Sequence, residues 1–189
     1  MLSVIIATDE SERALVSTLA ALVPGATAGA IREVIVADKG SRDKTAEVAD
    51  IAGCRILVSP APLAARLRAA AALARGDWLM FLRPGTTPDA TWIAEVMRFV
   101  EQAELAGERE ARTAVFSPGT LGRMPGVFAR LLPGRPRPEQ GLVIAKRRYE
   151  AVGGHRDGVA DPEADLLRRL GRGRTVVLRA VAIMLDHVN

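Results

Sequence analysis

The sequence predicts an α/β protein, a three-layer α/β/α sandwich around a mostly parallel central sheet. Three observations support this fold class. Through residues 2–106, short runs of β-branched and aliphatic residues alternate with longer segments whose apolar residues recur at helical spacing. Such alternation produces parallel strands joined by right-handed crossovers. The strand segments are almost continuously apolar, as expected when helices cover both faces of the sheet.

Four strands are expected in the first half, each a short apolar run, at residues 2–7, 33–37, 55–58 and 77–82. Four helices follow them in turn, at residues 11–23, 44–52, 63–74 and 91–106. Pro24-Gly25 is expected to stop the first helix, Gly53 the second and Gly76 the third. The fourth helix carries its large apolar side chains on one side, which predicts that this side packs against the sheet.

The second half of the chain is less regular. Strands are predicted at residues 114–117, 141–145, 175–178 and 182–185, and helices at 121–132, 147–152 and 162–170. Pro125-Gly126 interrupts the first of these helices, and a basic, proline-rich loop follows it at residues 133–138. Asp161-Pro162-Glu163 is a good helix start, because it combines an N-cap, a first-turn proline and an acid near the positive end of the dipole.

The composition argues against several classes of protein. No window approaches the roughly 18 consecutive apolar residues of a membrane span, and the N-terminus lacks the basic segment of a signal peptide. The lone Cys54 has no internal disulfide partner, and we expect a cytoplasmic protein. The net charge is +4, and only 4% of the residues are aromatic. The few aromatic residues argue against a nucleic-acid surface, and the basic excess fits a small anionic ligand or weak attraction to an anionic surface.

Charged residues stand where strands end, the edge at which open α/β sheets bind ligands. Thr8-Asp9-Glu10 follows the first strand in place of a glycine-rich phosphate loop, which disfavours dinucleotide-binding and P-loop proteins. Asp38 ends the second strand and is predicted to contact a nucleobase or ribose, since a carboxylate there has little structural reason. Asp43 is predicted to cap the next helix. Arg83 ends the fourth strand.

Several segments resemble the family-2 glycosyltransferases of the GT-A fold. They occur in order over nearly the whole chain, at residues 3–7, 33–45, 74–82, 140–154 and 162–170. The third of them reads Ala74-Arg-Gly-Asp-Trp-Leu-Met-Phe-Leu82. The resemblance implies one GT-A-like domain, with a nucleotide-binding half at 1–106 and an acceptor-side half at 107–189. It also implies inverting transfer of a sugar from a nucleotide-diphosphate sugar to an acceptor, which the sequence does not identify.

The resemblance places the nucleoside against Ala7, Asp9 and Asp38. The family binds its divalent metal through Asp-x-Asp, and that motif falls on Arg83-Pro84-Gly85. Mg²⁺ and Mn²⁺ require oxygen ligands, which these side chains lack, so the usual cofactor is in doubt.

An arginine offers a physical alternative to the metal, because a guanidinium binds diphosphate oxygens through two hydrogen bonds. We hypothesise that Arg83, with Arg66 or Arg68 from the preceding helix, takes over the role of the ion. The other reading is that Arg83 is a solvated loop residue. The protein would then be a catalytically degenerate module that binds a nucleotide sugar or a partner.

The catalytic base of the family is a Glu-Asp pair, which falls on Pro162-Glu163. Glu163 would take the proton of the acceptor hydroxyl, with Asp165 as a second candidate. Helix capping alone explains Glu163 equally well. The resemblance places Gln140 beside the acceptor, although a polar loop residue is as good a reading. His155 either contacts substrate or is a solvated loop residue.

Two further expectations concern the end of the chain. Some metal-using relatives have a late histidine ligand, to which His187 would correspond. Residues 121–137 combine apolar and basic side chains, as in a surface that receives a lipid-linked acceptor or rests on the inner face of a membrane. A packed or flexible segment over the site is the alternative.

Overall fold

The computed structural model of the chain describes residues 1–107, 112–119 and 135–184. Its middle layer is one eight-stranded sheet in the order β3-β2-β1-β4-β7-β6-β8-β5. The strands are β1 (Leu2–Thr8), β2 (Ile31–Asp38), β3 (Arg55–Val58), β4 (Trp78–Leu82), β5 (Thr86–Pro88), β6 (Thr113–Pro118), β7 (Leu142–Ala145) and β8 (Thr175–Met184). Strands β3, β2, β1 and β4 are parallel, and β7 then runs antiparallel to β4.

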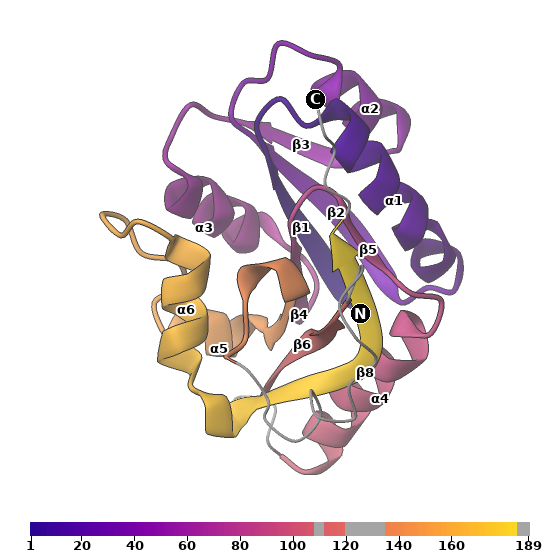
Figure 1. Cartoon of the computed structure of the whole chain (residues 1–189), viewed down its shortest axis with the longest axis vertical. Helices are drawn as coiled ribbons and strands as arrows, with labels where there is room; N and C mark the ends of the chain where they lie inside the picture. The colour runs from indigo at the N-terminus through magenta and orange to yellow at the C-terminus, as the bar shows by residue number, and fades with distance from the viewer. Residues whose placement is uncertain (108–111, 120–134, 185–189) are drawn as a thin grey trace.

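Helices cover both faces of the sheet, which confirms the predicted three-layer sandwich. Figure 1 shows α3, α5 and α6 on one side of the sheet and α1, α2 and α4 on the other. The helices are α1 (Glu12–Thr27), α2 (Thr45–Ile51), α3 (Leu63–Leu73), α4 (Trp92–Leu105), α5 (Lys146–Ala151) and α6 (Pro162–Leu170). Two short 3-10 helices, η2 (Pro138–Gln140) and η3 (Arg172–Arg174), complete the described elements.

The core lies in two layers because strand side chains alternate between the faces. Val4 and Ile6 of β1 join the apolar cluster under α1, α2 and α4, and Ile5 joins the cluster under α3, α5 and α6. Both clusters are buried, so the central strands read as nearly continuous apolar runs. The parallel register pairs Thr8 with Asp38, so β1 and β2 end side by side.

The predicted stop of the first helix at Pro24-Gly25 is wrong, because α1 continues to Thr27. The turn after the proline forms normally, with the N–H of Ala28 donating to the carbonyl of Pro24 at 2.9 Å. Gly25 lies against the indole of Trp92 in α4, where a Cβ would be only 2.4 Å from Cζ2. Packing between the two helices therefore overrides the local stop signal.

The C-terminal strands also differ from the prediction. The two strands expected at 175–178 and 182–185 are one continuous strand, β8, and the sequence analysis missed β5. β5 is short and polar, and it forms because Thr86–Pro88 pairs with the end of β8. The helix expected at 121–132 and the candidate His187 lie outside the described residues. In the described ranges, no helix is long and apolar enough to cross a bilayer.

Candidate functional site

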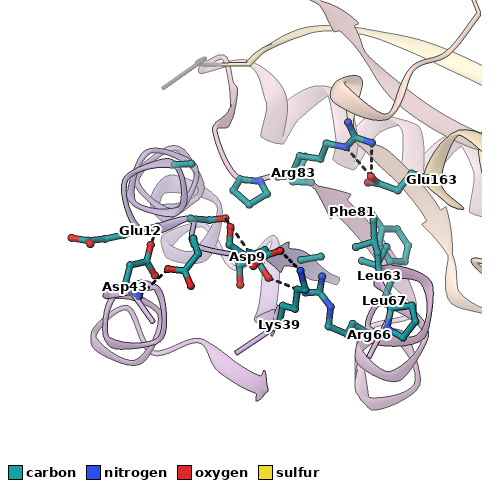
Figure 2. A pocket seen from close by; sticks show the side chains of 18 of the residues that line it. Asp9, Glu12, Lys39, Asp43, Leu63, Arg66, Leu67, Phe81, Arg83 and Glu163 are labelled. Atoms are coloured by element: carbon teal, nitrogen blue, oxygen red, sulfur yellow. Dashed lines mark hydrogen bonds and ion pairs between the residues drawn. The ribbon is translucent and has the colours of Figure 1, made fainter. Parts of the chain in front are cut away.

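A cavity of about 1340 Å³ opens where the parallel strands end (Figure 2). Its walls come from the loop after β1, the first turns of α1 and α3, and the turn after β4. Charged side chains of both signs line it, among them Asp9, Lys39, Arg66, Arg83 and Glu163. This is the edge at which the sequence predicted a ligand site.

A tight turn after β4 fixes the backbone of Arg83. The N–H of Thr86 donates to the carbonyl of Arg83 at 3.1 Å, and Gly85 has φ 88°, as the third position of a type II turn requires. The N–H of Gly85 also donates to the carbonyl of Ala14 at 3.0 Å and to Oγ1 of Thr18 at 2.9 Å. The turn is therefore attached to α1, and the direction in which Arg83 leaves the sheet is set by the scaffold.

The guanidinium of Arg83 is held by carboxylates from the second half of the chain. Its Nε and Nη2 lie 2.7 Å and 2.6 Å from Oε2 of Glu163, as the dashed lines in Figure 2 show. Its Nη1 donates to Oε1 of Glu139 at 2.9 Å, and Oδ2 of Asp161 lies 3.5 Å from Nη2. Arg83 is paired and half-buried, so it is not a solvated loop residue. Burial lowers the pKa of its guanidinium, but the ion pairs, with Glu163 first, outweigh this and raise the pKa.

The first turn of α6 places Glu163 beside Arg83. As predicted, Asp161 is the N-cap: its Oδ1 accepts from the N–H groups of Glu163 at 3.0 Å and Ala164 at 2.9 Å. The Glu163 side chain is only 14% exposed. Burial raises the pKa of its carboxyl and Arg83 lowers it, while Asp161 and Glu139 raise it further, and the net direction is upward. A carboxylate with a raised pKa is better matched to proton transfer near neutral pH.

The residues at the family's metal position do not fit a divalent ion. Residues 83–85 supply a guanidinium and no carboxylate, and that guanidinium is already paired with the nearest acids, Glu139, Asp161 and Glu163. In the part of the chain that the structure describes, no group of three or more His, Cys, Asp or Glu residues could hold a metal.

Asp38 has a structural role that the sequence analysis did not foresee. It is 1% exposed and does not line the cavity. Its Oδ1 accepts from Oγ1 of Thr8 at 2.7 Å and Oγ of Ser41 at 2.6 Å, and its Oδ2 accepts from the N–H groups of Gly40 and Ser41 at 2.8 Å and 2.7 Å. Burial raises the pKa of this carboxyl, but the four hydrogen bonds outweigh it and lower the pKa. The premise that Asp38 lacks a structural reason was wrong, and its contact with a nucleoside stays a prediction.

The two helical arginines of α3 are separated. Arg66 is 5% exposed and lines the cavity, with Nη1 donating to the carbonyls of Thr8 at 2.9 Å and Ala37 at 2.5 Å. Its Nη2 has no partner among the described residues, so it is available to a ligand. Arg68 points elsewhere and does not line the cavity: it binds the carbonyl of His155 at 2.6 Å and Oδ2 of Asp157 at 2.5 Å. Of the two, only Arg66 is placed to assist Arg83.

Asp165 and Gln140 do not reach the cavity either. Asp165 faces away from Glu163 and pairs with Arg168 at 2.5 Å and Arg169 at 2.7 Å, which lower the pKa of its carboxyl. Gln140 is 7% exposed, and its amide nitrogen donates to the carbonyl of Phe116 at 2.6 Å. Asp165 is thus paired within its own helix, and Gln140 ties η2 to β6.

His155 is buried, contrary to the solvated alternative. Its Nδ1 lies 2.8 Å from the hydroxyl of Tyr149, and its ring packs edge-on against Phe81 at 5.0 Å. Burial, with Arg169 and Arg68 nearby, lowers the pKa of His155 to about 3, so the imidazole is neutral. It does not line the cavity, and its proposed contact with substrate stays a prediction. Cys54 is half-buried, and burial raises its pKa to about 11, as expected of an unreactive thiol.

Two other predicted contacts, Ala7 and Asp9, do line the cavity. Asp9 pairs with Lys39 at 2.7 Å, and both side chains are half exposed. The sequence analysis missed Glu139 and Asp161 as partners of Arg83. No local pattern could have found them, since Glu139 lies 56 positions from Arg83 and reaches it only through the fold.

Comparison with known proteins places these observations in context. The model of the family described as glycosyl transferase family 2 matches residues 3–153. No curated protein matches the sequence.

Several solved structures share the fold at low sequence identity. *Staphylococcus aureus* TarS 1-349 in complex with UDP-GlcNAc is 16% identical, with a TM-score of 0.70 over 99% of this chain and 59% of its own. The mannosyltransferase PcManGT from *Pyrobaculum calidifontis*, in complex with GDP-Man and Mn²⁺, is 13% identical, with a TM-score of 0.76 over 96% of this chain and 56% of its own. Glucosyl-3-phosphoglycerate synthase from *Mycobacterium tuberculosis*, in complex with Mn²⁺, UDP and its product, is 18% identical, with a TM-score of 0.66 over 97% and 70%. The chain spans 60% of the length of TarS 1-349 in complex with UDP.

Proposed function

The chain belongs to glycosyl transferase family 2, and on that premise we propose that it transfers a sugar from a nucleotide-diphosphate sugar to an acceptor hydroxyl. One observation carries the proposal: Arg83 and Glu163, which are 80 positions apart, meet at 2.6 Å in the cavity at the strand ends. A cation suited to diphosphate and a sheltered carboxylate suited to proton transfer are thus side by side. The sequence alone had assigned these two roles to the same two residues.

The donor side of the cavity has the electrostatics that a diphosphate needs. Helices α1 and α3 both begin at the cavity, so the positive ends of their dipoles face it. Arg66 and Arg83 line the same space from opposite walls (Figure 2), and Asp9 with Lys39 offers an acceptor and a donor to a nucleobase. We therefore place the nucleoside near Asp9 and the diphosphate between the two arginines.

In the proposed reaction the carboxylate of Glu163 accepts a proton and the guanidinium of Arg83 stabilises the leaving group. The acceptor oxygen attacks the anomeric carbon and forms the new glycosidic bond, while its proton passes to the carboxylate of Glu163. The bond from that carbon to the diphosphate oxygen breaks, and its electron pair stays on the diphosphate. The guanidinium of Arg83 stabilises this developing charge in place of a metal ion. Attack on the face opposite the leaving group inverts the anomeric centre.

We propose different roles for the two halves of one domain. Residues 1–106 would bind the donor, and residues 107–189 would supply the base and the acceptor surface. The idea of a lipid-linked acceptor or of attachment to the inner face of a membrane rests on the sequence of residues 121–137, of which 121–134 lie outside the described ranges.

A second candidate function is a non-catalytic module that binds a nucleotide sugar or a partner. The observation that favours it is that the guanidinium of Arg83 is already paired with Glu163 and Glu139. Such a module would keep the cavity and the fold while Glu163 served only to hold the arginine.

Calorimetry with UDP-glucose, UDP-GlcNAc and GDP-mannose tests the first step, each measured with Mg²⁺ and with EDTA. We expect one donor to bind equally well in both, and Arg83→Ala to weaken it by at least about tenfold, since a charge-assisted contact to phosphate is lost. Arg68→Ala, from outside the cavity, is the matched control and should bind normally. Binding abolished by EDTA would overturn the metal-free proposal, and release of nucleoside diphosphate from a bound donor would separate the enzyme from the binding module.

A further inference from the structure

The contact between Arg83 and Glu163 occupies the part of the guanidinium that a phosphate would use. Nε and Nη2 form the side-on fork of an arginine, the pair of parallel N–H groups that binds two oxygens at once. Here both groups point at one oxygen of Glu163, at 2.7 Å and 2.6 Å. A diphosphate can take that fork only if the Glu163 carboxylate gives it up.

One of the two remaining partners of Arg83 binds the nitrogen outside the fork, and the other lies at the edge of the fork. Glu139, on η2, takes Nη1 at 2.9 Å, and Asp161 lies 3.5 Å from Nη2. Both acids are 45% exposed, whereas Glu163 is 14% exposed. Because Glu139 binds Nη1, which is not part of the fork, it can keep the guanidinium in place while the fork changes partner. The turn attached to α1 holds the backbone of Arg83.

We infer that the pair formed by Arg83 and Glu163 is a latch: a donor diphosphate takes over the side-on fork of Arg83 and thereby releases the Glu163 carboxylate to act as the base. In this arrangement Glu139 is a positioning residue, which holds Arg83 through Nη1 in both states. The inference rests on the proposed function and adds to it an order of events. The base becomes free only after the donor has bound.

The charged groups around Glu163 determine how its pKa changes when Arg83 releases it. Arg83 faces it from the turn after β4, Asp161 from the start of its own helix and Glu139 from η2. Arg83 alone among these lowers the pKa of Glu163, while burial and the two acids raise it. Once the guanidinium serves a diphosphate, that stabilisation is lost and two phosphate charges are added nearby. The pKa of Glu163 therefore rises, and the protein takes up protons as the donor binds at pH values near that pKa. Above it the released carboxylate stays ionised and can act as the base.

Proton uptake can be measured with the intact chain and a donor that does not itself titrate near neutral pH. Calorimetric titration with UDP-glucose, UDP-GlcNAc or GDP-mannose, repeated in buffers of different ionisation enthalpy from about pH 5 to about pH 8, counts the protons taken up. We expect net uptake by the unaltered protein. Glu163→Gln should abolish the uptake and bind the same donor about three- to tenfold more tightly, because no carboxylate competes for the fork.

Glu139→Gln is the matched variant, since it removes a different carboxylate from the same arginine. It should keep the proton uptake, because Glu163 is still displaced. A second readout needs no variant: with turnover, the acidic limb of kcat should lie at higher pH than that of kcat/KM, since kcat reports the donor-bound protein.

The possible results distinguish a failure of the latch from a failure of the proposed function. If a donor binds without proton uptake, and Glu163→Gln binds it no more tightly, the latch is wrong while the donor site stands. Coincident acidic limbs for kcat and kcat/KM would overturn the latch in the same way. If none of the donors binds to the unaltered protein, the proposed function fails and the latch fails with it.

Discussion

At the end of β2, the carboxylate of Asp38 accepts four hydrogen bonds from donors that its own turn and β1 supply. Near the end of β4, by contrast, the carboxylate of Glu163 in α6 has a single side-chain partner among the described residues, Arg83. Both acids are sheltered at the same edge of one sheet. We call Asp38 a closed carboxylate, because the backbone N–H groups that bind it cannot move to another partner. We call Glu163 an exchangeable carboxylate, because the guanidinium that binds it can turn to another anion. Burial alone therefore does not mark a functional carboxylate, whereas partners that another group can replace do.

The largest effect should come from Glu163→Gln on turnover. If Glu163 is the base, kcat falls by about 10²- to 10⁴-fold, since general-base catalysis contributes that much. The measurement is release of nucleoside diphosphate from the donor found by calorimetry, with circular dichroism to confirm folding. Undiminished turnover would mean that the role of Glu163 is structural, like that of Asp38.

Asp38→Asn should give the next largest effect, on stability. An amide presents two N–H donors where two of the four donors already point, so buried groups lose their acceptor at a cost of about 2 to 4 kcal/mol in the free energy of unfolding. Urea denaturation measures it. Asp157→Asn is the control: its side chain is 54% exposed, and its pairing with Arg68 should be worth less than about 1 kcal/mol. An equal loss in both variants would remove the distinction between a closed carboxylate and an ordinary surface pair.

Arg83→Ala tests the exchangeable centre in the same way and should destabilise the protein less than Asp38→Asn. The Arg83 side chain is 31% exposed, and two of its three acidic partners are 45% exposed, so water can replace those two pairs. The third partner, Glu163, can take up a proton when the arginine is removed, because burial raises its pKa. We expect a loss of about 1 kcal/mol or less in urea denaturation. A loss as large as that of Asp38→Asn would show that Arg83 is held for stability.

The smallest effect is a difference in pH dependence. The pKa of Asp38 is lowered by folding, so its contribution to stability is present above its unfolded pKa of about 3.9 and is lost as the pH falls through the folded value. The pKa of Glu163 is raised, so the folded state holds the proton more tightly and stability declines as the pH rises from about 4.3 through the folded value. Denaturation of Glu163→Gln across this range should lack the second decline, whose slope is at most about 1.4 kcal/mol per pH unit.

Local pattern was enough to predict the parallel half of the fold. The strands that became β1 to β4 and the helices between them stand where the apolar periodicity placed them, because each is a strong local signal in agreement with its neighbours. The predictions of secondary structure were wrong where a residue far away in the sequence determines the local structure. α1 runs through Pro24 because Gly25 packs on Trp92, and β5 exists because it pairs with β8.

The site was predicted less completely, and for the same reason. Sequence reasoning named Arg83 and Glu163 separately, and the fold brought them together. It could not tell that Arg68 is occupied by a loop, or that His155 is buried against Tyr149, since those partners lie far away or depend on the path of a glycine turn. Residue types at strand ends thus indicate where chemistry can occur, and the contacts between elements decide which of them remain free.

The attachment of residues 83–86 to α1 has a consequence for the design of inhibitors. Because Gly85 is bonded to Ala14 and Thr18, the origin of the guanidinium and the α1 wall of the cavity form one unit. A compound that spans this wall and Arg83 needs a stiff spacer of fixed length. On the opposite side, where α6 and η2 supply only side chains to the arginine, larger and more varied groups should be tolerated.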